Sequence, residues 1–488
     1  MDWMPELIPN WINGEQFPAA SGKEFDNLNP ATGERLCGVA FSETPDVSRA
    51  VEVAKEAQPA WAALTPVARG DLLREVALKI RERSEHFARI VSLETGKSFG
   101  DALGETGAAV EMGMFVAGEG RRSYGRTTTS AVPNRAAMVI RQPLGVAGLI
   151  IAANTPIANV AWKVFPALLC GNAVVLKGSE DTPVTAWAVG EVFHEAGIPP
   201  GVLNIVQGLG PEAGQPLVEN HDVDIVSFTG SAGVGRLIQR IAGERLAKVC
   251  MELGGKNPLV VCDDADLDVA AETAILSAFS NAGQRCASGS RIIVFNEIYD
   301  KFRDMLIDRT GSLKMGPSDT DDFGPVINAK QLANMVAAVE RARESGATIL
   351  TGGKRLTDDE HKGGFYMAPT IIEDARPSDA ISRDELFGPI TCLYRVKDFT
   401  EAVELVNDSP FGLTAAIHTK NMHRAMTFMN EVKTGVISIN GATYGSEPHM
   451  PFGGLGQSGT GWREAGTEAL DVYSDWKTVY IVHDPTDV

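Results

Sequence analysis

Hydrophobic positions recur at helical spacing over much of the first hundred residues. Over 45–64 and again over 68–97, apolar side chains return every three or four positions, which is the period of an amphipathic helix. Gly96 falls at the end of the second segment, where a glycine can adopt the left-handed conformation that ends a helix. The pattern therefore predicts that the N-terminal part of the chain is helical.

From residue 146 the pattern changes to short apolar runs that alternate with helical segments. The runs predict strands over 146–153, 172–178, 202–208 and 223–230. Helical spacing follows the first, second and fourth of these runs, over 157–170, 184–197 and 234–243. Continuous Val, Ile and Leu strands joined by helices are typical of a parallel sheet that is covered on both faces. We therefore expect a dinucleotide-binding type of architecture in this region.

A second alternating series begins near residue 255. It predicts strands over 257–264 and 290–296 and helices over 267–286 and 299–309. Gly- and Asp-rich segments between 310 and 385 predict surface loops. The segments 127–143 and 471–482 predict strands outside both series, and exposed strands of this kind often pair between subunits.

Length, charge and cysteine usage restrict the class of protein. A chain of 488 residues indicates two or three folding units, and its net charge of −19 argues against a nucleic-acid partner. The longest apolar passage, 145–162, is interrupted by polar residues and a proline, so we expect no membrane span, and the N-terminus lacks the basic region of a secretory signal. The six scattered cysteines form no CxxC pair and there is no histidine cluster, so we expect a reduced, cytoplasmic protein with no metal site.

Two glycine-rich loops follow predicted strands. In "QGLGPEAG" (207–214) the glycine spacing is one residue off the dinucleotide fingerprint, and a simple strand-to-helix turn explains it equally well. In "FTGSAGVG" (228–235), Ser231 and the glycines would offer a hydroxyl and backbone N–H groups at a helix N-terminus, an arrangement that binds phosphate. A structural turn is again the alternative.

Four polar side chains lie at the ends of apolar strands. Lys177 ends one strand, at the edge where parallel sheets bind ligands, and Glu180 could accept hydrogen bonds from a ribose diol; ordinary solvated side chains are the alternative. Glu252 is either a buried base with a raised pKa or a plain strand-end carboxylate. The Asn154 amide could donate to an oxyanion, or Asn154 is a turn residue before Pro156.

Cys286 differs from the other cysteines in its neighbours. It lies in "NAGQRCASGSR" among small residues, where a thiolate could be reached by a substrate. Cys170, Cys250 and Cys262 lie in apolar runs and are expected in the core. The residues alone leave open whether Cys286 is a nucleophile or a structural thiol.

Six motifs together resemble the aldehyde dehydrogenase superfamily nearly from end to end. They are "VVLKGSE", "FTGSAGVG", "MELGGKNP", "GQRC", "DELFGPI" and "PFGGLGQSG", in the order and with the separations usual in that family. The resemblance implies an α/β fold with a Rossmann-like cofactor domain (1–123 and 145–253), an α/β catalytic domain (254–456) and a small β oligomerisation region (124–144 and 472–488). It also implies a homodimer or homotetramer.

The resemblance further assigns roles to single residues. It implies that Cys286 is the nucleophile, Glu252 the general base and Asn154 a donor to the oxyanion. The positions that it implies for cofactor binding are Lys177, Glu180, Gly230, Ser231, Gly235, Glu385 and Phe387. A carboxylate at Glu180 would accept a hydrogen bond from a ribose 2′-hydroxyl and repel a 2′-phosphate, so we expect NAD rather than NADP.

These residue types account for oxidation of an aldehyde to a carboxylic acid. A Cys286 thiolate would attack the carbonyl carbon, and the resulting hemithioacetal would lose a hydride to the nicotinamide and become a thioester. Water would then cleave the thioester, with Glu252 removing the proton.

The chain departs from the common family pattern near the expected substrate pocket. The residues that differ are Ala152, Ala153, Thr155 and Gly178, which predict a wider and more polar pocket and a looser turn after Lys177. Arg285 and His449 are candidate contacts for an anionic group, so we expect a polar or acidic semialdehyde as substrate. For Arg285 the alternative is a structural salt bridge.

Other functions stay open at this point. Within the family these are an aromatic aldehyde dehydrogenase and a CoA-acylating semialdehyde dehydrogenase. Outside it they are a cysteine hydrolase, for which only His449 lies near the motifs, and an inactive structural member, although both the thiol and the base are present.

Overall fold

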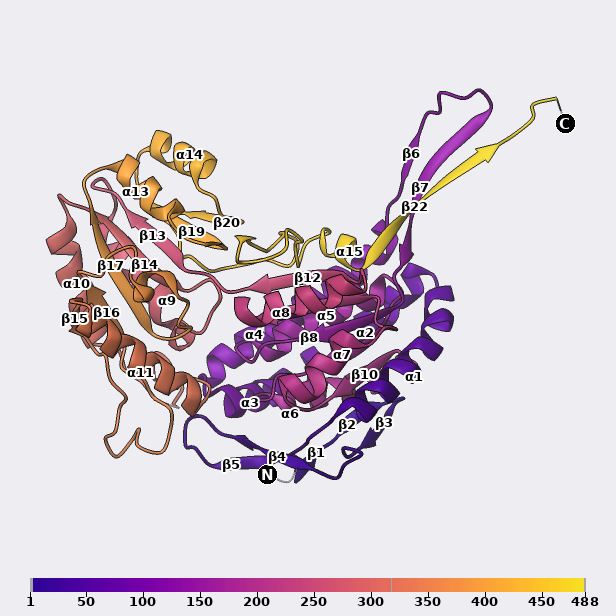
Figure 1. Ribbon diagram of the computed structural model, residues 1–488, viewed down its shortest axis with the longest axis horizontal. Helices are drawn as coiled ribbons and strands as arrows, with labels where there is room; N and C mark the ends of the chain where they lie inside the picture. Colours follow the sequence, from indigo (N-terminus) through magenta and orange to yellow (C-terminus); the bar gives the residue numbers. More distant parts are fainter. Residues whose placement is uncertain (1–2, 317, 487–488) are drawn as a thin grey trace.

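Two seven-stranded sheets form the body of the protein. In the computed structural model, which describes residues 3–316 and 318–486, the two sheets lie side by side (Figure 1). The chain passes from the first sheet to the second near residue 255 and returns after residue 439. Within these residues, no helix combines the length and the apolar character needed to cross a bilayer.

The first large sheet has the strand order β12-β11-β8-β9-β10-β2-β3. Its strands are β2 (Asn10–Ile12), β3 (Glu15–Phe17), β8 (Val146–Ile150), β9 (Ala173–Lys177), β10 (Leu203–Val206), β11 (Ile225–Gly230) and β12 (Lys248–Leu253). The strands from β12 to β10 are parallel, and the β10–β2 and β2–β3 pairs are antiparallel. The strands predicted between 146 and 230 are confirmed, as is their parallel arrangement.

Helices cover both faces of this sheet. On one face lie α1 (Thr44–Ala63), α7 (Gln215–Glu219) and α8 (Ala232–Glu244). On the other lie α5 (Pro156–Leu169) and α6 (Pro183–Glu195), backed by α2 (Pro66–Glu82), α3 (Ser84–Thr95) and α4 (Phe99–Gly118). Each face therefore has its own hydrophobic core, which explains why the strands are apolar on both sides.

The second large sheet has the order β15-β16-β17-β14-β13-β19-β20, and only β15 is antiparallel to its neighbour. Its strands are β13 (Asn257–Val261), β14 (Gly289–Phe295), β15 (Thr348–Thr351), β16 (Thr370–Glu373), β17 (Ile390–Val396), β19 (Thr414–His418) and β20 (Val436–Ile439). Its helices are α9 (Leu267–Phe279), α10 (Tyr299–Gly311), α11 (Ala329–Glu344), α12 (Ala380–Arg383), α13 (Phe399–Asn407) and α14 (Met422–Glu431). One core holds the sheet and these helices together.

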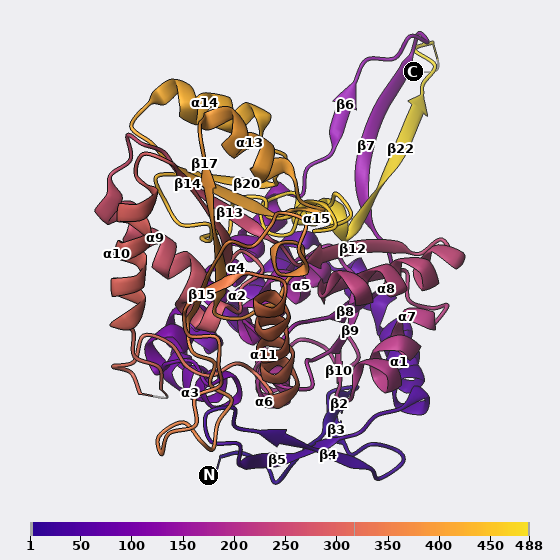
Figure 2. The ribbon, with the colours of Figure 1, turned by 60° about the vertical axis from the view of Figure 1, so that its left-hand side comes forward.

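A three-stranded antiparallel arm projects from the body in both views (Figures 1 and 2). It consists of β6 (Arg126–Thr128), β7 (Arg135–Pro143) and β22 (Ser474–Val482), which follows the short helix α15 (Ala469–Val472). The strands predicted over 127–143 and 471–482 are therefore confirmed, and they pair with each other. The domain boundaries and the oligomerisation role stay predictions.

The N-terminal part differs from the helical prediction in two ways. Before α1 lie the short strands β1 (Leu7–Ile8), β2, β3, β4 (Glu24–Leu28) and β5 (Arg35–Ala40). Of these, β1, β5 and β4 form a small sheet. The single helix predicted over 68–97 is two helices, α2 and α3, because the chain leaves helical geometry at Arg83. The role of Gly96 is confirmed: it ends α3 with a left-handed φ of 72°.

The remaining elements are short. They are the strands β18 (Phe411–Gly412) and β21 (Leu455–Gly456), the single turns η1 (Glu119–Arg122) and η3 (Ser280–Gly283), and the π-helical turn η2 (Gly210–Gly214) in the first glycine-rich loop.

The Gly96→Ala substitution tests how strongly this helix end depends on glycine. An alanine Cβ at position 96 would lie 2.3 Å from Cγ of Pro325, in addition to the strain of the positive φ. We expect the free energy of unfolding to fall by roughly 2–5 kcal/mol, the sum of a left-handed alanine and an overpacked contact.

Gly346→Ala is the matched control, because Gly346 also has a positive φ, 97°, but no atom lies within 4 Å of the position of its Cβ. We expect a loss of about 1 kcal/mol there, from the backbone alone. Equal shifts of the two thermal midpoints would show that the contact with Pro325 does not matter.

Candidate functional site

The predicted site residues lie where the two large sheets meet. Because β8, β9, β11 and β12 are parallel, Lys177, Gly230 and Glu252 all lie at the carboxyl edge of the first sheet, and Asn154 follows β8 there. The amino ends of β13, β14 and β17 face this edge, and β12 leads from one sheet toward the other (Figure 1).

Cys286 lies in a tight loop before β14. The helix predicted over 267–286 ends earlier, at Phe279, because three successive residues have positive φ: Asn281 at 54°, Ala282 at 54° and Gly283 at 65°. The Asn257 side chain then donates to the Cys286 carbonyl at 2.7 Å and to the Ser288 carbonyl at 2.9 Å. The loop is thus held by hydrogen bonds from the Asn257 side chain to its backbone and does not depend on the Cys286 side chain.

The thiol of Cys286 is half-buried in an environment that disfavours negative charge. Burial raises its pKa to about 12, and the negative charges of Glu252 and Glu385 act in the same direction. The thiol is therefore protonated in the resting protein at neutral pH. Cysteines 37, 250, 262 and 392 are fully buried, as core residues are, and Cys170 is also only half-buried.

Glu252 lies on β12, and both of its carboxylate oxygens are buried without a hydrogen-bond partner among the described residues. Burial raises the pKa of Glu252 well above its ordinary value, and the neighbouring charge of Glu464 raises it further. Lys163 and Arg463 oppose this shift. Of the two readings of Glu252, the structure therefore places it as the buried acid with a raised pKa.

Below Glu252 lies a buried ionic cluster that the sequence reading missed. Lys163 of α5 contacts the Glu464 carboxylate and donates to the Ser227 hydroxyl at 2.8 Å, and Ser227 donates to the same carboxylate at 2.9 Å. Lys163 and Glu464 are fully buried and 301 positions apart in sequence. The only signal was a lysine inside the apolar helical segment 157–170.

Asn154 lies between β8 and α5 with its side chain half-exposed. Its Oδ1 accepts a long hydrogen bond of 3.5 Å from Asn159, while its Nδ2 donates to no acceptor in residues 3–316 and 318–486. Its backbone carbonyl accepts from Lys97 at 2.8 Å and from the Asn281 side chain at 3.4 Å. The amide N–H groups of Asn154 are thus available to a ligand, and the backbone behind them is anchored.

Lys177 and Glu180 form an ion pair of 2.8 Å at the carboxyl end of β9. Lys177 is buried and Glu180 is exposed. Partial desolvation of the Glu180 carboxyl by its neighbours would raise its pKa, but the charge of Lys177 and its hydrogen bond together lower the pKa, so Glu180 is ionised at neutral pH. The pair thus offers a fixed cation and a fixed carboxylate at the ligand-binding edge of the sheet.

The second glycine-rich loop has the predicted strand-to-helix geometry. Gly230 ends β11, and Ser231 caps α8 by accepting a hydrogen bond from the Val234 N–H at 3.4 Å. Gly235 packs so closely on Leu253 that a Cβ would lie 2.6 Å from it, whereas Gly233 faces open space. Gly235 therefore has a packing role, and the open side of the loop lies at Gly233.

Glu385 and Phe387 precede β17 and complete the junction. The Gly255 N–H donates to Glu385 Oε1 at 3.1 Å, and a Cβ on Gly254 would lie only 1.7 Å from Oε2, so this approach requires glycine. Burial raises the pKa of Glu385 to about 7, although the Gly255 N–H and the charge of Lys256 lower it. Phe387 has a positive φ of 55°, which turns the chain into β17.

Arg285 and His449, the candidate contacts for an anionic group, differ in their surroundings. The Arg285 guanidinium lies 4.8 Å from the centre of the Tyr444 ring, and its Nε is buried without a partner. Among the described residues Arg285 forms no ion pair, so the structural salt bridge considered from the sequence is absent there. His449 is exposed, 3.8 Å from Glu447.

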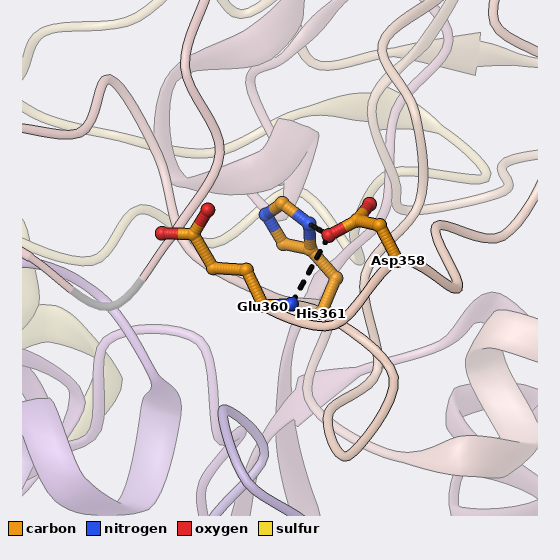
Figure 3. Close-up of side chains that lie close together, drawn as sticks. All are labelled: Asp358, Glu360 and His361. Atoms are coloured by element: carbon orange, nitrogen blue, oxygen red, sulfur yellow. Dashed lines mark hydrogen bonds and ion pairs between the residues drawn. The ribbon is translucent and has the colours of Figure 1, made fainter.

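A cluster of Asp358, Glu360 and His361 lies in a loop outside this junction (Figure 3). Both ring nitrogens of His361 are hydrogen-bonded at 2.7 Å, Nδ1 to Asp358 and Nε2 to the Met315 carbonyl. Burial would lower the pKa of His361, but these two acceptors raise it. The hydrogen bonds account for the cluster as a clasp between two loops.

Comparison with known proteins agrees with this geometry. Residues 17–479 match the model of the aldehyde dehydrogenase family. The α-ketoglutaric semialdehyde dehydrogenase of Bacillus subtilis is 39% identical over 475 residues, which cover 97% of each chain. A mitochondrial aldehyde dehydrogenase of Leishmania tarentolae is 40% identical over 474 residues, or 96% of this chain and 94% of the relative.

The fold is also that of a solved enzyme. The crystal structure of betaine aldehyde dehydrogenase from Staphylococcus aureus in complex with NAD⁺ superposes with a TM-score of 0.96 at 34% identity, covering 98% of this chain and 95% of the other. The chain therefore belongs to the aldehyde dehydrogenase family and is an enzyme that oxidises aldehydes with a nicotinamide dinucleotide cofactor.

Proposed function

We propose that this enzyme oxidises an aldehyde that carries a carboxylate, a semialdehyde, and that it uses NAD. The observation that carries the substrate class is Arg285, one residue before Cys286, a cation with no counterion in the part of the chain that the structure describes. A carboxylate on the substrate would supply that counterion and form charge-assisted hydrogen bonds with the guanidinium. The name of the B. subtilis relative, a semialdehyde dehydrogenase, supports this choice.

The reaction that we propose begins at Cys286. Its thiol loses a proton to solvent, and the thiolate adds to the aldehyde carbon, so the carbonyl oxygen becomes an oxyanion. The Asn154 Nδ2, which has no acceptor in the described part of the chain, and a backbone N–H stabilise that oxyanion. When NAD is bound, its nicotinamide supplies the acceptor for the hydride, and the carbon is left as a thioester of Cys286.

Hydrolysis of the thioester is the proposed task of Glu252. A carboxylate whose oxygens have no partner among the described residues and whose pKa is raised is a stronger base than an ordinary carboxylate, and it can take a proton from water. The hydroxide adds to the thioester carbon, the C–S bond breaks, and Glu252 returns its proton to the departing thiolate, so the carboxylic acid leaves with Cys286 restored as a thiol and Glu252 as a carboxylate.

The residues at the carboxyl edge of the first sheet fit a dinucleotide. Gly233 and Ser231 offer the open N-terminus of α8 to phosphate, and Lys177 and Glu180 offer a cation and a carboxylate to the ribose. Gly230 and Gly235 shape this loop, while Glu385 and Phe387 lie on the Cys286 side, where we place the nicotinamide end.

We also propose that the enzyme forms a homodimer or homotetramer through the arm. The end of β22 carries exposed Tyr480, Ile481 and Val482, and both outer strands of the arm have unpaired edges. A cytoplasmic location is part of the same proposal, supported by six unpaired thiols.

Substitution of Cys286 and Glu252 separates the two chemical steps. We expect Cys286→Ala to abolish cofactor reduction. Glu252→Gln should retain a burst of about one reduced cofactor per site, because hydride transfer precedes hydrolysis and because the substitution removes a charge that raises the Cys286 pKa. Steady turnover should fall by roughly 100- to 10,000-fold. Rapid-mixing absorbance at the reduced-nicotinamide band measures both.

Glu272→Gln, at an exposed carboxylate on α9, is the control and should leave both phases unchanged. Steady turnover by either site variant at the normal rate would remove the assigned role. Recovery of Glu252→Gln turnover on addition of CoA would instead favour acyl transfer.

Arg285→Met tests the substrate class, because methionine keeps an unbranched stem and removes the charge. With 4-oxobutanoate, kcat/KM should fall by about 10- to 100-fold, the loss of one or two charge-assisted hydrogen bonds. With butanal, which has the same length and no carboxylate, it should change by less than about twofold, and Arg285→Lys should retain part of the preference. An equal loss on both aldehydes would mean that Arg285 only supports the loop.

Glu180→Gln tests the cofactor preference. The wild-type enzyme should favour NAD, because the ionised Glu180 would repel a 2′-phosphate. In the variant, the ratio of kcat/KM for NADP to that for NAD should rise by about 10-fold or more. Glu244→Gln, at the far end of α8, is the control. A wild-type enzyme that uses NADP as well as NAD would contradict the proposal.

A further inference from the structure

The backbone carbonyl of Asn154 joins three separate parts of the chain. It accepts a hydrogen bond from Lys97 Nζ at 2.8 Å and one from Asn281 Nδ2 at 3.4 Å. Asn281 belongs to the left-handed turn that leads to Cys286. This one oxygen therefore ties the segment of the proposed oxyanion donor to the loop of the nucleophile and to a buried lysine.

Lys97 is fixed from the opposite side by Glu105 of α4. The Lys97 Nζ lies 2.6 Å from Glu105 Oε2, and each side chain is only 5% exposed. The other Glu105 oxygen accepts from the Ile157 N–H at 3.1 Å, in the first turn of α5. The ion pair thus holds both ends of the short link, 154–157, that connects the oxyanion donor to its helix.

The backbone of Lys97 is itself held. Its carbonyl accepts from the Ser92 hydroxyl at 2.7 Å, and Gly96 packs against Pro325 in the second half of the chain. Lys97 therefore donates from a fixed base, not from a mobile loop.

We propose that Lys97 and Glu105 are positioning residues for the oxyanion donor: they fix the distance between the Asn154 amide and the Cys286 sulfur. The inference rests on the proposed role of Asn154. A buried ion pair often stabilises a fold no more than apolar residues would. An error of about 1 Å in the placement of a catalytic group, in contrast, can cost about 100-fold in rate.

A positioning role predicts that the effects of losing Lys97 and losing the Asn154 amide are coupled, whereas a purely structural ion pair predicts that they are independent. If Lys97 acts on the reaction only through Asn154, its loss matters only while the Asn154 amide is present. The test compares Lys97→Met, Asn154→Ala and the double variant by the rate of the reduced-cofactor burst, with the thermal midpoint measured in parallel.

We expect Asn154→Ala to slow the burst by about 100- to 1,000-fold and Lys97→Met by about 10- to 100-fold. The double variant should match Asn154→Ala within about twofold, because the two losses are not independent. The dissociation constant for NAD should be unchanged in Lys97→Met.

Arg69→Met is the matched control, because Arg69 of α2 contacts the C-terminal end of α5, whereas Lys97 and Glu105 hold its N-terminal end. Arg69 is buried and donates to the Leu169 carbonyl at 2.9 Å and to the Ala62 carbonyl at 3.1 Å. Its loss should lower the thermal midpoint as much as Lys97→Met does, while the burst rate stays at the wild-type value.

If Lys97→Met does not fold, Glu105→Gln replaces it in the same test. Glutamine keeps the shape of the side chain, but its amide N–H group would face one of the two donors, Lys97 Nζ or the Ile157 N–H, from which Glu105 accepts hydrogen bonds. In one contrary outcome, Asn154→Ala slows the burst, and adding Lys97→Met or Glu105→Gln slows it further by the same factor as that substitution causes alone. This result would overturn the positioning role and leave the proposed function intact. A normal rate in Lys97→Met would do the same. A normal rate in Asn154→Ala would overturn both.

Discussion

The site depends on two glycines that allow three charged or reactive segments to meet. Gly254 and Gly255 are the first residues after β12, and the chain enters β13 only two positions later. A Cβ on Gly254 would lie 1.7 Å from the Glu385 carboxylate, and one on Gly255 would lie 2.8 Å from the Cys286 carbonyl. Any side chain here would push the nucleophile loop and the Glu385 segment away from Glu252. Close approach of the backbone, not left-handed geometry, is thus what this glycine pair provides.

The same close approach concentrates negative charge around one sulfur. Glu252 is buried and Glu385 is half-buried, and each raises the pKa of Cys286 beyond the effect of burial alone. Their own pKa values are raised because burial disfavours the charged form, so the unliganded site holds fewer charges than its residue types suggest. Lys163 limits this effect because its charge favours ionisation of Glu252, although the charge of its partner Glu464 raises the Glu252 pKa by more. Perturbed acids gathered at a junction of two sheets are typical of a catalytic site.

The sequence predicts the parts of this arrangement that depend on local pattern. Lys177 at the end of β9 and Ser231 at the start of α8 follow from an apolar strand and the residues after it. The strands within 7–40 were missed because most have two to five residues, too few to show a period of two. The helix over 267–286 was predicted too long because Asn281 and Ala282 carry no signal of their positive φ. The Lys163–Glu464 and Asn154–Lys97 contacts join residues 301 and 57 positions apart, so no local pattern reveals them; the family resemblance placed Cys286 and Glu252 and did not reach these supports.

Arg285, a cation beside the proposed nucleophile, has no counterion among the described residues, which requires a cause. The Arg285 Nε is buried without a partner among the described residues, which costs free energy, and the ring of Tyr444 offsets only part of that cost. The net charge of −19 means that carboxylates are abundant in this chain, yet none in its described part pairs with Arg285. Arg285, which is unpaired in this part of the chain, adds a positive charge near the thiol that counteracts the charges of Glu252 and Glu385. Under the function proposed above, the substrate carboxylate is the counterion, and the same arginine charge opposes the effect of Glu252 and Glu385 on the thiol.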